Sequence, residues 1–327
     1  MKTQVLYVLV SDSSDYYAEQ AYVSMLSLRR NSPSSSIIVL VDTTTDKAMP
    51  GRAAVGRKIM ALADRWVVAD IDPSLPKVLR SRLLKTGMRS YVSGDFLFID
   101  SDTVVCGPLD EMDDCSSDLA MCPDHHCRLD DNPVRKDLVT RCRSIGADIS
   151  GQEYYFNSGV IFARDVPQVH SFFKSWQENY RQSYAGGLKT DQQPLAKTIL
   201  NSGFSPAVLE GKWNCQLPYG VRYLRDAVIL HYFAGSFTIG DSALYVLCDK
   251  ALLDEIRRTG ELPQAAQDVL EDHFKGISQI SFLSPERDML FWTTRRYRDL
   301  KRSYVPGKFS WLEFVLKVRA RLPFRKK

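Results

Sequence analysis

The sequence predicts an α/β fold in which a parallel-type sheet carries helices on both faces, followed by a basic helical C-terminal extension. Apolar runs of strand length alternate with segments of helical periodicity, which is the pattern of such sheets. Apolar residues make up 44% and charged residues 25% of the 327 residues, so the composition excludes a disordered, collagen-like or coiled-coil chain. No apolar run approaches the roughly 18 residues that a membrane-spanning helix needs.

Short apolar runs in the first hundred residues predict strands that are buried on both faces. They cover residues 5–10, 37–41, 66–69 and 96–99. A helix is expected after the first run, because apolar residues follow the helical spacing i, i+3, i+4, i+7 at Ala18, Ala21, Tyr22 and Met25. This helix should end near residues 31–33, where the sequence reads Asn-Ser-Pro.

The middle of the chain continues the alternation. A strand at 160–162 should be followed by a helix that Asp165 caps. One apolar stripe of this helix is expected to face the core: Val169, Phe172, Phe173, Trp176 and Tyr180. Another apolar strand, 227–230, ends at His231, and helical patterns follow at 251–257 and 265–274.

Charge is distributed unevenly along the chain. The net charge is +4, yet residues 285–327 carry +9 and the remainder carries −5. This asymmetry indicates an anionic partner for the tail alone.

Within this tail, residues 295–327 predict peripheral contact with an anionic membrane. The stretch after Pro306-Gly307 places its apolar residues on one helical stripe and lysines and arginines beside them, as in helices that lie in a membrane interface. The stripe comprises Trp311, Phe314, Val315, Val318 and Leu322. A solvated helix packed on the body or on a partner subunit is the alternative. Nucleic acid is not expected, since a binding surface for it would interleave basic and aromatic residues.

The most informative segment is Asp100-Ser101-Asp102, which directly follows the apolar run 96–99. In parallel sheets, ligands bind beyond the carboxyl ends of the strands, and Ser11-Asp12 follows another strand in the same way. Two carboxylates separated by one residue can reach one Mg²⁺ or Mn²⁺ ion that also binds substrate phosphates. Taken alone, Asp-x-Asp is common by chance and is more often a polar turn at a strand end than a metal site.

Together with other segments in the same order, this run resembles the Asp-x-Asp strand of glycosyltransferase family 8, the retaining group that includes lipopolysaccharide galactosyltransferases and glycogenin. The matching segments are Val-Ser-Asp at 10–12, Ser-Arg-Leu-Leu-Lys-Thr at 81–86, Tyr-Phe-Asn-Ser-Gly-Val at 155–160, Thr-Asp-Gln at 190–192 and Leu-His-Tyr-Phe at 230–233. The resemblance covers residues 4–240, about three quarters of the chain.

The resemblance implies a GT-A fold, with a Rossmann-like mixed sheet flanked by helices. We expect a catalytic domain at 1–245, a helical part of that domain at 246–284 and, after the composition shift near Pro285, the basic amphipathic tail at 285–327. The resemblance further implies a retaining hexosyltransferase that uses a UDP-sugar donor and a glycan or glycolipid acceptor.

The resemblance also assigns roles to individual residues. Asp100, Asp102 and His231 would hold the metal ion, and Asp191 and Asn157 would hold the donor hexose, with Gln192 near the anomeric carbon. The remaining donor-binding residues would be Ser11, Asp12, Arg82, Lys85 and Ser101. On its own, each residue also has a structural interpretation: a core histidine, a turn, a helix N-terminus or a solvated basic face.

Chemistry supports a metal in such a site. Cleavage of the glycosidic bond leaves negative charge on the departing phosphate, which a divalent ion stabilises as a Lewis acid. A histidine nitrogen among the ligands favours Mn²⁺ over Mg²⁺. Retention can arise by double displacement or by front-face attack, and the sequence offers no glutamate placed as an obvious nucleophile, so we expect front-face attack.

One departure from the family concerns the stretch after His231. Relatives commonly carry Gly-x-x-Lys there, whereas this chain reads Tyr-Phe-Ala-Gly-Ser-Phe at 232–237. The cation for the diphosphate must therefore come from elsewhere. A non-catalytic binding protein on the same fold stays an alternative, as does a sugar nucleotidyltransferase, although residues 8–16 lack the glycines of its phosphate loop.

Soft ligands cluster at Cys122, His125, His126 and Cys127, which makes zinc conceivable, but a variable loop over the acceptor site fits better. Trp213 suits either stacking on a sugar or core packing. The run at 5–10 turns polar too soon for a signal peptide, and the odd, scattered set of 7 cysteines predicts reduced thiols. We therefore expect a cytoplasmic protein, with the tail on the cytoplasmic face of the membrane.

Overall fold

The computed structural model describes residues 2–277, except 221, 235–237, 240, 241 and 244. The chain divides into two compact units, Met1–Ser281 and Phe282–Lys327. The predicted basic tail at 285–327 lies outside the described residues. Within the described residues, no helix has both the length and the apolar character needed to cross a membrane.

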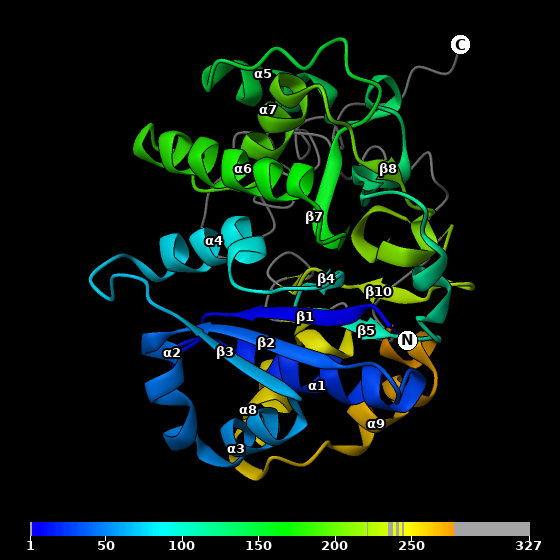
Figure 1. Cartoon of the computed structure of the whole chain (residues 1–327). Coiled ribbons are helices and arrows are strands. Elements are labelled where there is room, and N and C mark those ends of the chain that lie inside the picture. Colours follow the sequence, from blue (N-terminus) through cyan, green and yellow to red (C-terminus); the bar gives the residue numbers. More distant parts are fainter. Residues whose placement is uncertain (1, 221, 235–237, 240–241, 244, 278–327) are drawn as a thin grey trace, which may run out of the picture. The chain divides into compact units, whose positions relative to one another are not determined.

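The first unit is built around a seven-stranded sheet with the order β3-β2-β1-β4-β7-β6-β8 (Figure 1). Its strands, in chain order, are β1 (Gln4–Leu9), β2 (Ile37–Asp42), β3 (Arg65–Ala69), β4 (Phe96–Ile99), β6 (Leu119–Pro123), β7 (Phe156–Ala163) and β8 (Ala207–Val208). β1 pairs in parallel with β2 and β4, and β2 pairs in parallel with β3. β7 runs antiparallel to β4 and β6, so the sheet is mixed, and its first four strands are parallel as predicted.

Helices cover both faces of this sheet. On one face lie α1 (Tyr17–Asn31), α3 (Ala53–Leu62), α8 (Lys250–Thr259) and α9 (Gln264–Glu271), and on the other α4 (Lys77–Gly87), α5 (Arg135–Ser144), α6 (Pro167–Ala185) and α7 (Gln192–Ser202) (Figure 1). A short helix, α2 (Thr43–Ala48), follows β2. Alternate residues of β1 explain the two layers, because Val5 and Tyr7 pack in the first core and Leu6 packs in the second.

The predicted stripe on α6 is buried from Val169 to Tyr180. The predicted cap of this helix was wrong. Val166 occupies the N-cap position, and the Asp165 carboxylate accepts hydrogen bonds from the Gly94 N–H and the His170 ring instead. Pro167 opens the helix without an N–H, which removes one of the donors that a capping carboxylate would bind.

A second, three-stranded sheet has the order β5-β10-β9 and consists of β5 (Thr103–Val105), β10 (Ile229–His231) and β9 (Cys215–Gln216). Two short strands, β11 (Thr238–Ile239) and β12 (Ser242–Ala243), form a separate pair. Because only three residues, 100–102, separate β4 from β5, the small sheet is joined directly to the edge of the large sheet where its parallel strands end.

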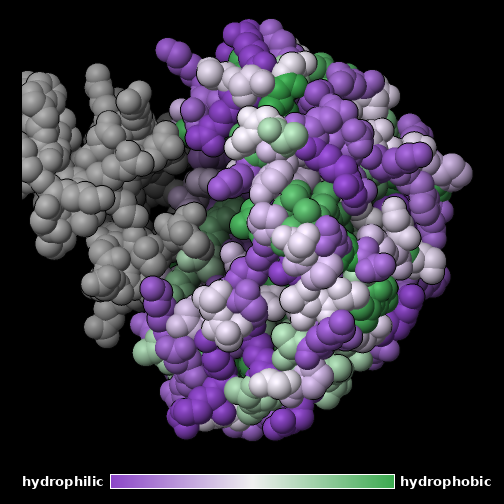
Figure 2. All heavy atoms as spheres, turned by 90° about the vertical axis from the view of Figure 1, so that its left-hand side faces the viewer, coloured by the Kyte–Doolittle hydropathy of each residue, from purple (hydrophilic) through white to green (hydrophobic). Residues whose placement is uncertain are grey.

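The described side chains on the face shown in Figure 2 are mainly hydrophilic, and hydrophobic ones gather in small groups between them. This distribution is ordinary for a protein surface, on which single apolar residues are common. The long apolar runs of the sequence lie instead in the two cores, one on each side of the sheet.

Candidate active site

A cavity of about 560 Å³ opens at the carboxyl ends of β1 and β4. Its walls come from the start of α1, one side of α4, the β4–β5 turn, the start of β7, the start of α7 and the residues after β10. This is the position at which α/β sheets bind their ligands.

The β4–β5 turn carries Asp100, Ser101 and Asp102, and all three line the cavity. The turn is fixed from two sides. The Asp100 N–H donates to the Gly159 carbonyl at 2.8 Å, and the Thr103 hydroxyl donates to the Asp100 carbonyl at 2.8 Å. The backbone therefore holds both carboxylates at the cavity wall.

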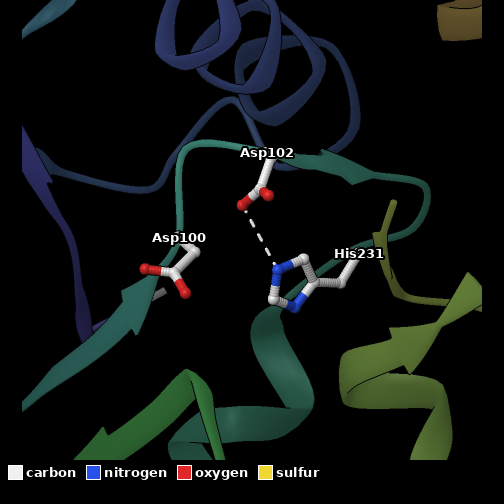
Figure 3. Close-up of side chains that lie close together, drawn as sticks. All are labelled: Asp100, Asp102 and His231. Atoms are coloured by element: carbon white, nitrogen blue, oxygen red, sulfur yellow. Dashed lines mark ion pairs between the residues drawn. The ribbon is translucent and has the colours of Figure 1, made fainter. Parts of the chain in front are cut away.

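His231 reaches this turn through strand pairing. β10 runs antiparallel to β5 and places His231 opposite Thr103. The His231 Nε2 atom consequently lies 3.2 Å from Asp102 Oδ1, and the two side chains point toward each other in Figure 3. One ligand atom from each of Asp100, Asp102 and His231 lies within 4.8 Å of the others.

The surroundings of these side chains fit a divalent metal ion. The His231 Nδ1 atom lies 3.0 Å from the Asn214 amide oxygen, and this contact orients the ring with Nε2 toward Asp102, where Nε2 becomes a metal ligand once it carries no proton. The Ala234 N–H donates to the other oxygen of Asp102 at 3.0 Å. Two carboxylates and one imidazole form a mixed oxygen and nitrogen set that suits Mn²⁺.

Position 159, beside His231, has room only for a glycine. A Cβ atom at that position would lie 2.3 Å from His231 Cε1, which no real contact allows. The glycine of the Asn-Ser-Gly segment thus gives the imidazole room next to β7.

The environments shift the pKa values of the two metal-site carboxyls in opposite directions. For Asp102, burial favours the neutral acid, but the His231 imidazole and the Ala234 N–H outweigh it and lower the pKa to about 2. For Asp100, burial dominates and raises the pKa, although Lys85 opposes this.

Asp191 lies at the N-cap position of α7 without capping the helix through its side chain. Its carboxylate instead accepts from the Ser158 hydroxyl at 3.0 Å and lies 3.4 Å from both Arg82 Nε and Lys85 Nζ. Burial opposes ionisation, but these two cations hold the pKa of Asp191 well below its usual range. Arg82 and Lys85 share one side of α4, as their i, i+3 spacing predicts, and both line the cavity.

Asn157 lies inside β7, and Gln192 is the first residue of α7. Both line the cavity, and both amide nitrogens face Asp124 Oδ1, at 3.1 Å from Asn157 Nδ2 and 3.4 Å from Gln192 Nε2. Asn157 Oδ1 accepts from the Gly159 N–H and from Asn214 Nδ2. This network fixes the orientation of both amides next to Asp191.

Asp124 was missed by the sequence analysis. It is buried at the end of β6, and its carboxylate accepts from two of the predicted sugar ligands. Asp124 is a polar residue directly after a strand, as Asp100 is, and this position could have identified it. It lies within the Cys- and His-rich stretch 122–127, which we interpreted as a variable loop.

The structure does not bring those zinc candidates together. Cys122 Sγ donates to the Glu210 carbonyl, the His125 ring stacks on Tyr219, and His126 Nε2 contacts the Asn214 carbonyl. In the part of the chain that the structure describes, the group with the geometry of a metal site is Asp100, Asp102 and His231. Trp213 is 6% exposed and packs in the core, so it offers no face to a sugar.

Ser11 and Asp12 lie outside the cavity lining. The Ser11 hydroxyl donates to Asp15 at 2.6 Å and accepts from Arg52, while the Asp12 carboxylate binds Ser14 and Lys77. Neighbouring residues line the cavity in their place: Val10, Asp15, Tyr16, Tyr17 and Gln20. The turn that sequence analysis selected is therefore at the cavity, but different side chains face it.

Comparison with known proteins gives a fold. No family model matches the chain, and no curated protein matches it. Among solved structures, the glycosyltransferase GlyE of Streptococcus pneumoniae TIGR4 is 15% identical, with a TM-score of 0.50 over 86% of this chain and 66% of that one.

Two further structures match over 99% of their own length. Mouse xyloside xylosyltransferase 1 is 13% identical with a TM-score of 0.48 over 72% of this chain. The galactosyltransferase LgtC, in complex with donor and acceptor sugar analogs, is 15% identical with a TM-score of 0.46 over 81% of this chain. The match to GlyE shows the fold: this chain has the GT-A glycosyltransferase fold, as the resemblance implied.

Proposed function

We propose that this chain is a metal-dependent, retaining glycosyltransferase that moves a hexose from a UDP-sugar to a hydroxyl of a glycan or glycolipid. The observation that carries this proposal is the convergence of Asp100, Asp102 and His231 on one point of the cavity wall. Asp191, Asn157 and Gln192 line the same cavity, so the residues proposed for the cation and those proposed for the sugar adjoin.

Asp100, Asp102 and the His231 Nε2 atom would hold Mn²⁺, or Mg²⁺ in its place. Such an ion supplies Lewis acidity toward the two phosphates of the donor and stabilises the charge that grows on the leaving group. By accepting from Nδ1–H, Asn214 would favour the tautomer that donates a lone pair from Nε2 to the ion.

Asp191 would accept hydrogen bonds from hydroxyls of the donor hexose. Arg82 and Lys85 keep its buried carboxylate ionised, and Ser158 restricts its rotation. Asn157 and Gln192 would bind further hydroxyls, with Gln192 nearest the anomeric carbon. Uncharged amides suit this task because they position a sugar without stabilising a competing phosphate.

Transfer would proceed by front-face attack. The bond between the anomeric carbon and the leaving phosphate oxygen breaks, the acceptor oxygen bonds to the same face, and the acceptor proton passes to that phosphate. The carboxylates among the described cavity-lining residues are Asp15, Asp100, Asp102 and Asp191, and Asp191 is already paired with two cations. Each of the other three also has a basic partner, which is Lys77 for Asp15, Lys85 for Asp100 and His231 for Asp102. These pairings favour a mechanism in which no side chain is glycosylated. A glycosyl adduct trapped on any of these side chains and detected by mass spectrometry would contradict the mechanism.

The family that the sequence resembles commonly carries a lysine for the diphosphate after the metal histidine, and this chain does not. Three basic side chains line the cavity and can compensate: Lys77, Arg82 and Lys85. Lys77 at present pairs with Asp15 at 2.7 Å and with Asp12 at 3.0 Å. It would exchange these partners for a phosphate, whereas Arg82 is held near the sugar site by Asp191.

The test is thermal unfolding against a panel of UDP-, ADP- and GDP-sugars, with and without Mn²⁺, followed by product analysis for the sugar that stabilises. A ligand at 100 times its Kd stabilises by about 2.7 kcal/mol. We expect a Mn²⁺-dependent rise in Tm with one UDP-sugar, which Asp102→Asn removes. Asp148→Asn, at an exposed ion pair with Arg143, is the matched control and should retain it. The proposal fails if no nucleotide sugar stabilises the wild type.

A further inference from the structure

Lys85 is a buried cation that contacts the metal site directly. It lies on the third turn of α4, and its side chain is 4% exposed. Its Nζ atom lies 3.0 Å from both oxygens of Asp100 and 3.4 Å from Asp191 Oδ2. It also stands 5.1 Å from the centre of the Phe98 ring, where the aromatic face adds to the attraction for a positive charge.

This placement sets Lys85 apart from the other basic side chains in the cavity. Arg82 reaches Asp191, and Lys77 reaches Asp12 and Asp15. Of the three, Lys85 is the one that contacts a predicted metal ligand, Asp100. Both carboxylate oxygens of Asp100 therefore already contact the Lys85 ammonium group.

A divalent ion on Asp100 must therefore share a carboxylate with an ammonium group or displace it. Like charges only a few ångströms apart repel, and the repulsion is stronger where water is excluded. Displacement is hindered because Asp191 and Phe98 hold the lysine from other sides. Ionised Asp100 and Asp102 together carry a charge of −2, and the positive charge of Lys85 reduces this to −1 for an incoming cation.

We propose that Lys85 is a resident cation that weakens metal binding to the free protein, so that the metal binds tightly only together with the diphosphate of the donor. The diphosphate contributes the negative charge that Lys85 has neutralised. Metal and nucleotide then bind cooperatively, and each raises the affinity of the other by the same factor. Lys85 acts here through Asp100 as a positioning residue, and this inference rests on the proposed metal site.

The experiment measures Mn²⁺ binding by the loss of the free Mn²⁺ signal in electron paramagnetic resonance, with and without UDP. It requires no turnover. Wild-type protein should bind Mn²⁺ weakly alone and more tightly with UDP. Lys85→Met, which keeps the apolar stem and removes the charge, should bind Mn²⁺ without UDP at least tenfold more tightly than the wild type, a difference of 1.4 kcal/mol.

Lys77→Met is the matched control. It removes one positive charge from the same cavity, but Lys77 binds Asp12, Ser14 and Asp15 and not the predicted metal ligands. Without UDP, when no phosphate is present for Lys77 to bind, the Mn²⁺ affinity of Lys77→Met should stay within about threefold of the wild type, well under the 1.4 kcal/mol of a tenfold change. If Lys85→Met does not fold, as judged by circular dichroism, Lys85→Gln provides the same comparison.

The outcomes separate the inference from the proposed function. If the wild type binds Mn²⁺ with UDP, and Lys85→Met binds Mn²⁺ alone no more tightly than the wild type does, the role given to Lys85 is wrong while the metal site stands. An equal gain in Lys77→Met would also overturn the inference, because net cavity charge would then explain it. If no protein binds Mn²⁺ with or without UDP, the proposed metal site itself is wrong.

Discussion

The Nε2 atom of His231 lies 3.2 Å from Asp102 Oδ1 because β10 pairs with β5 and sets His231 opposite Thr103. Strand pairing, and not proximity in sequence, thus assembles the candidate metal site. Because both residues sit at strand ends held by backbone hydrogen bonds, the geometry should persist when one side chain is removed.

Asp102→Ala should abolish transfer and leave the fold intact. The substitution removes one predicted metal ligand and the acceptor of the Ala234 N–H. We expect activity to fall at least about 100-fold, or about 2.7 kcal/mol in transition-state stabilisation. Sugar transfer and Tm are the measurements. Asp148→Ala, at an exposed pair, is the control, and full activity in Asp102→Ala would refute the metal role.

Asn214→Leu should weaken Mn²⁺ binding although Asn214 is not a predicted ligand. Its amide oxygen accepts from His231 Nδ1 and so fixes the tautomer of the ring. Loss of such a partner costs about 10- to 100-fold in metal affinity. Asn214→Asp keeps an acceptor and should recover part of the loss. Equal Mn²⁺ affinity in Asn214→Leu and wild type, measured by electron paramagnetic resonance, would show that the ring is oriented by other contacts.

Glu19→Ala should destabilise the protein strongly. Glu19 is fully buried in α1, and its carboxylate binds Arg52 at 2.8 Å and Arg257 at 2.9 Å, which ties α1 to α8. Breaking a buried pair by removing one partner costs about 3–5 kcal/mol. Glu153→Ala, whose pair with Arg128 is exposed, should cost under about 1 kcal/mol. Urea unfolding measures both, and similar losses in the two variants would contradict this account.

The stability advantage of wild type over Asp191→Asn should depend on pH. Arg82 and Lys85 hold the pKa of Asp191 below its usual range despite its burial. A carboxyl with a lowered folded-state pKa contributes stability above its unfolded pKa of about 3.9 and loses that contribution as pH falls. The difference in urea midpoint should therefore be greatest above about pH 5 and shrink towards pH 3. A difference that grows on acidification would mean that Asp191 is protonated in the folded protein.

The full chain should bind anionic lipid vesicles at low salt through residues 295–327. Each basic residue near an anionic surface contributes about 1 kcal/mol. Replacing Lys317, Arg319 and Arg321 by glutamate should therefore weaken binding by about 100-fold or more, as measured by co-sedimentation. Neutral vesicles are the control. Wild-type protein that ignores anionic vesicles would favour a tail packed on the body or on a partner subunit.

Local pattern determined much of this protein. The apolar runs at 5–10, 37–41 and 96–99 specify parallel strands, because a strand buried on both faces needs apolar residues at almost every position. The run at 66–69 also forms a parallel strand, but the prediction that it is buried on both faces was wrong, since β3 lies at the edge of the sheet and Val68 is 42% exposed. The helical stripe from Val169 to Tyr180 specifies a core-facing helix in the same way. The position of Asp100 and Asp102 at the end of a strand placed them at the ligand-binding edge of the sheet.

Tertiary structure decided which side chains meet. Nothing in the sequence states that Lys85 contacts Asp100, that Asn214 orients His231, or that Asp124 faces Gln192. The preference of aspartate for helix N-caps predicted that Asp165 would cap α6. In the folded chain its carboxylate binds Gly94 and His170 instead. Periodicity reports whether a residue faces the core, since that depends on neighbours three or four positions away. Contacts between distant segments depend on strand order and helix packing, which only the folded chain defines.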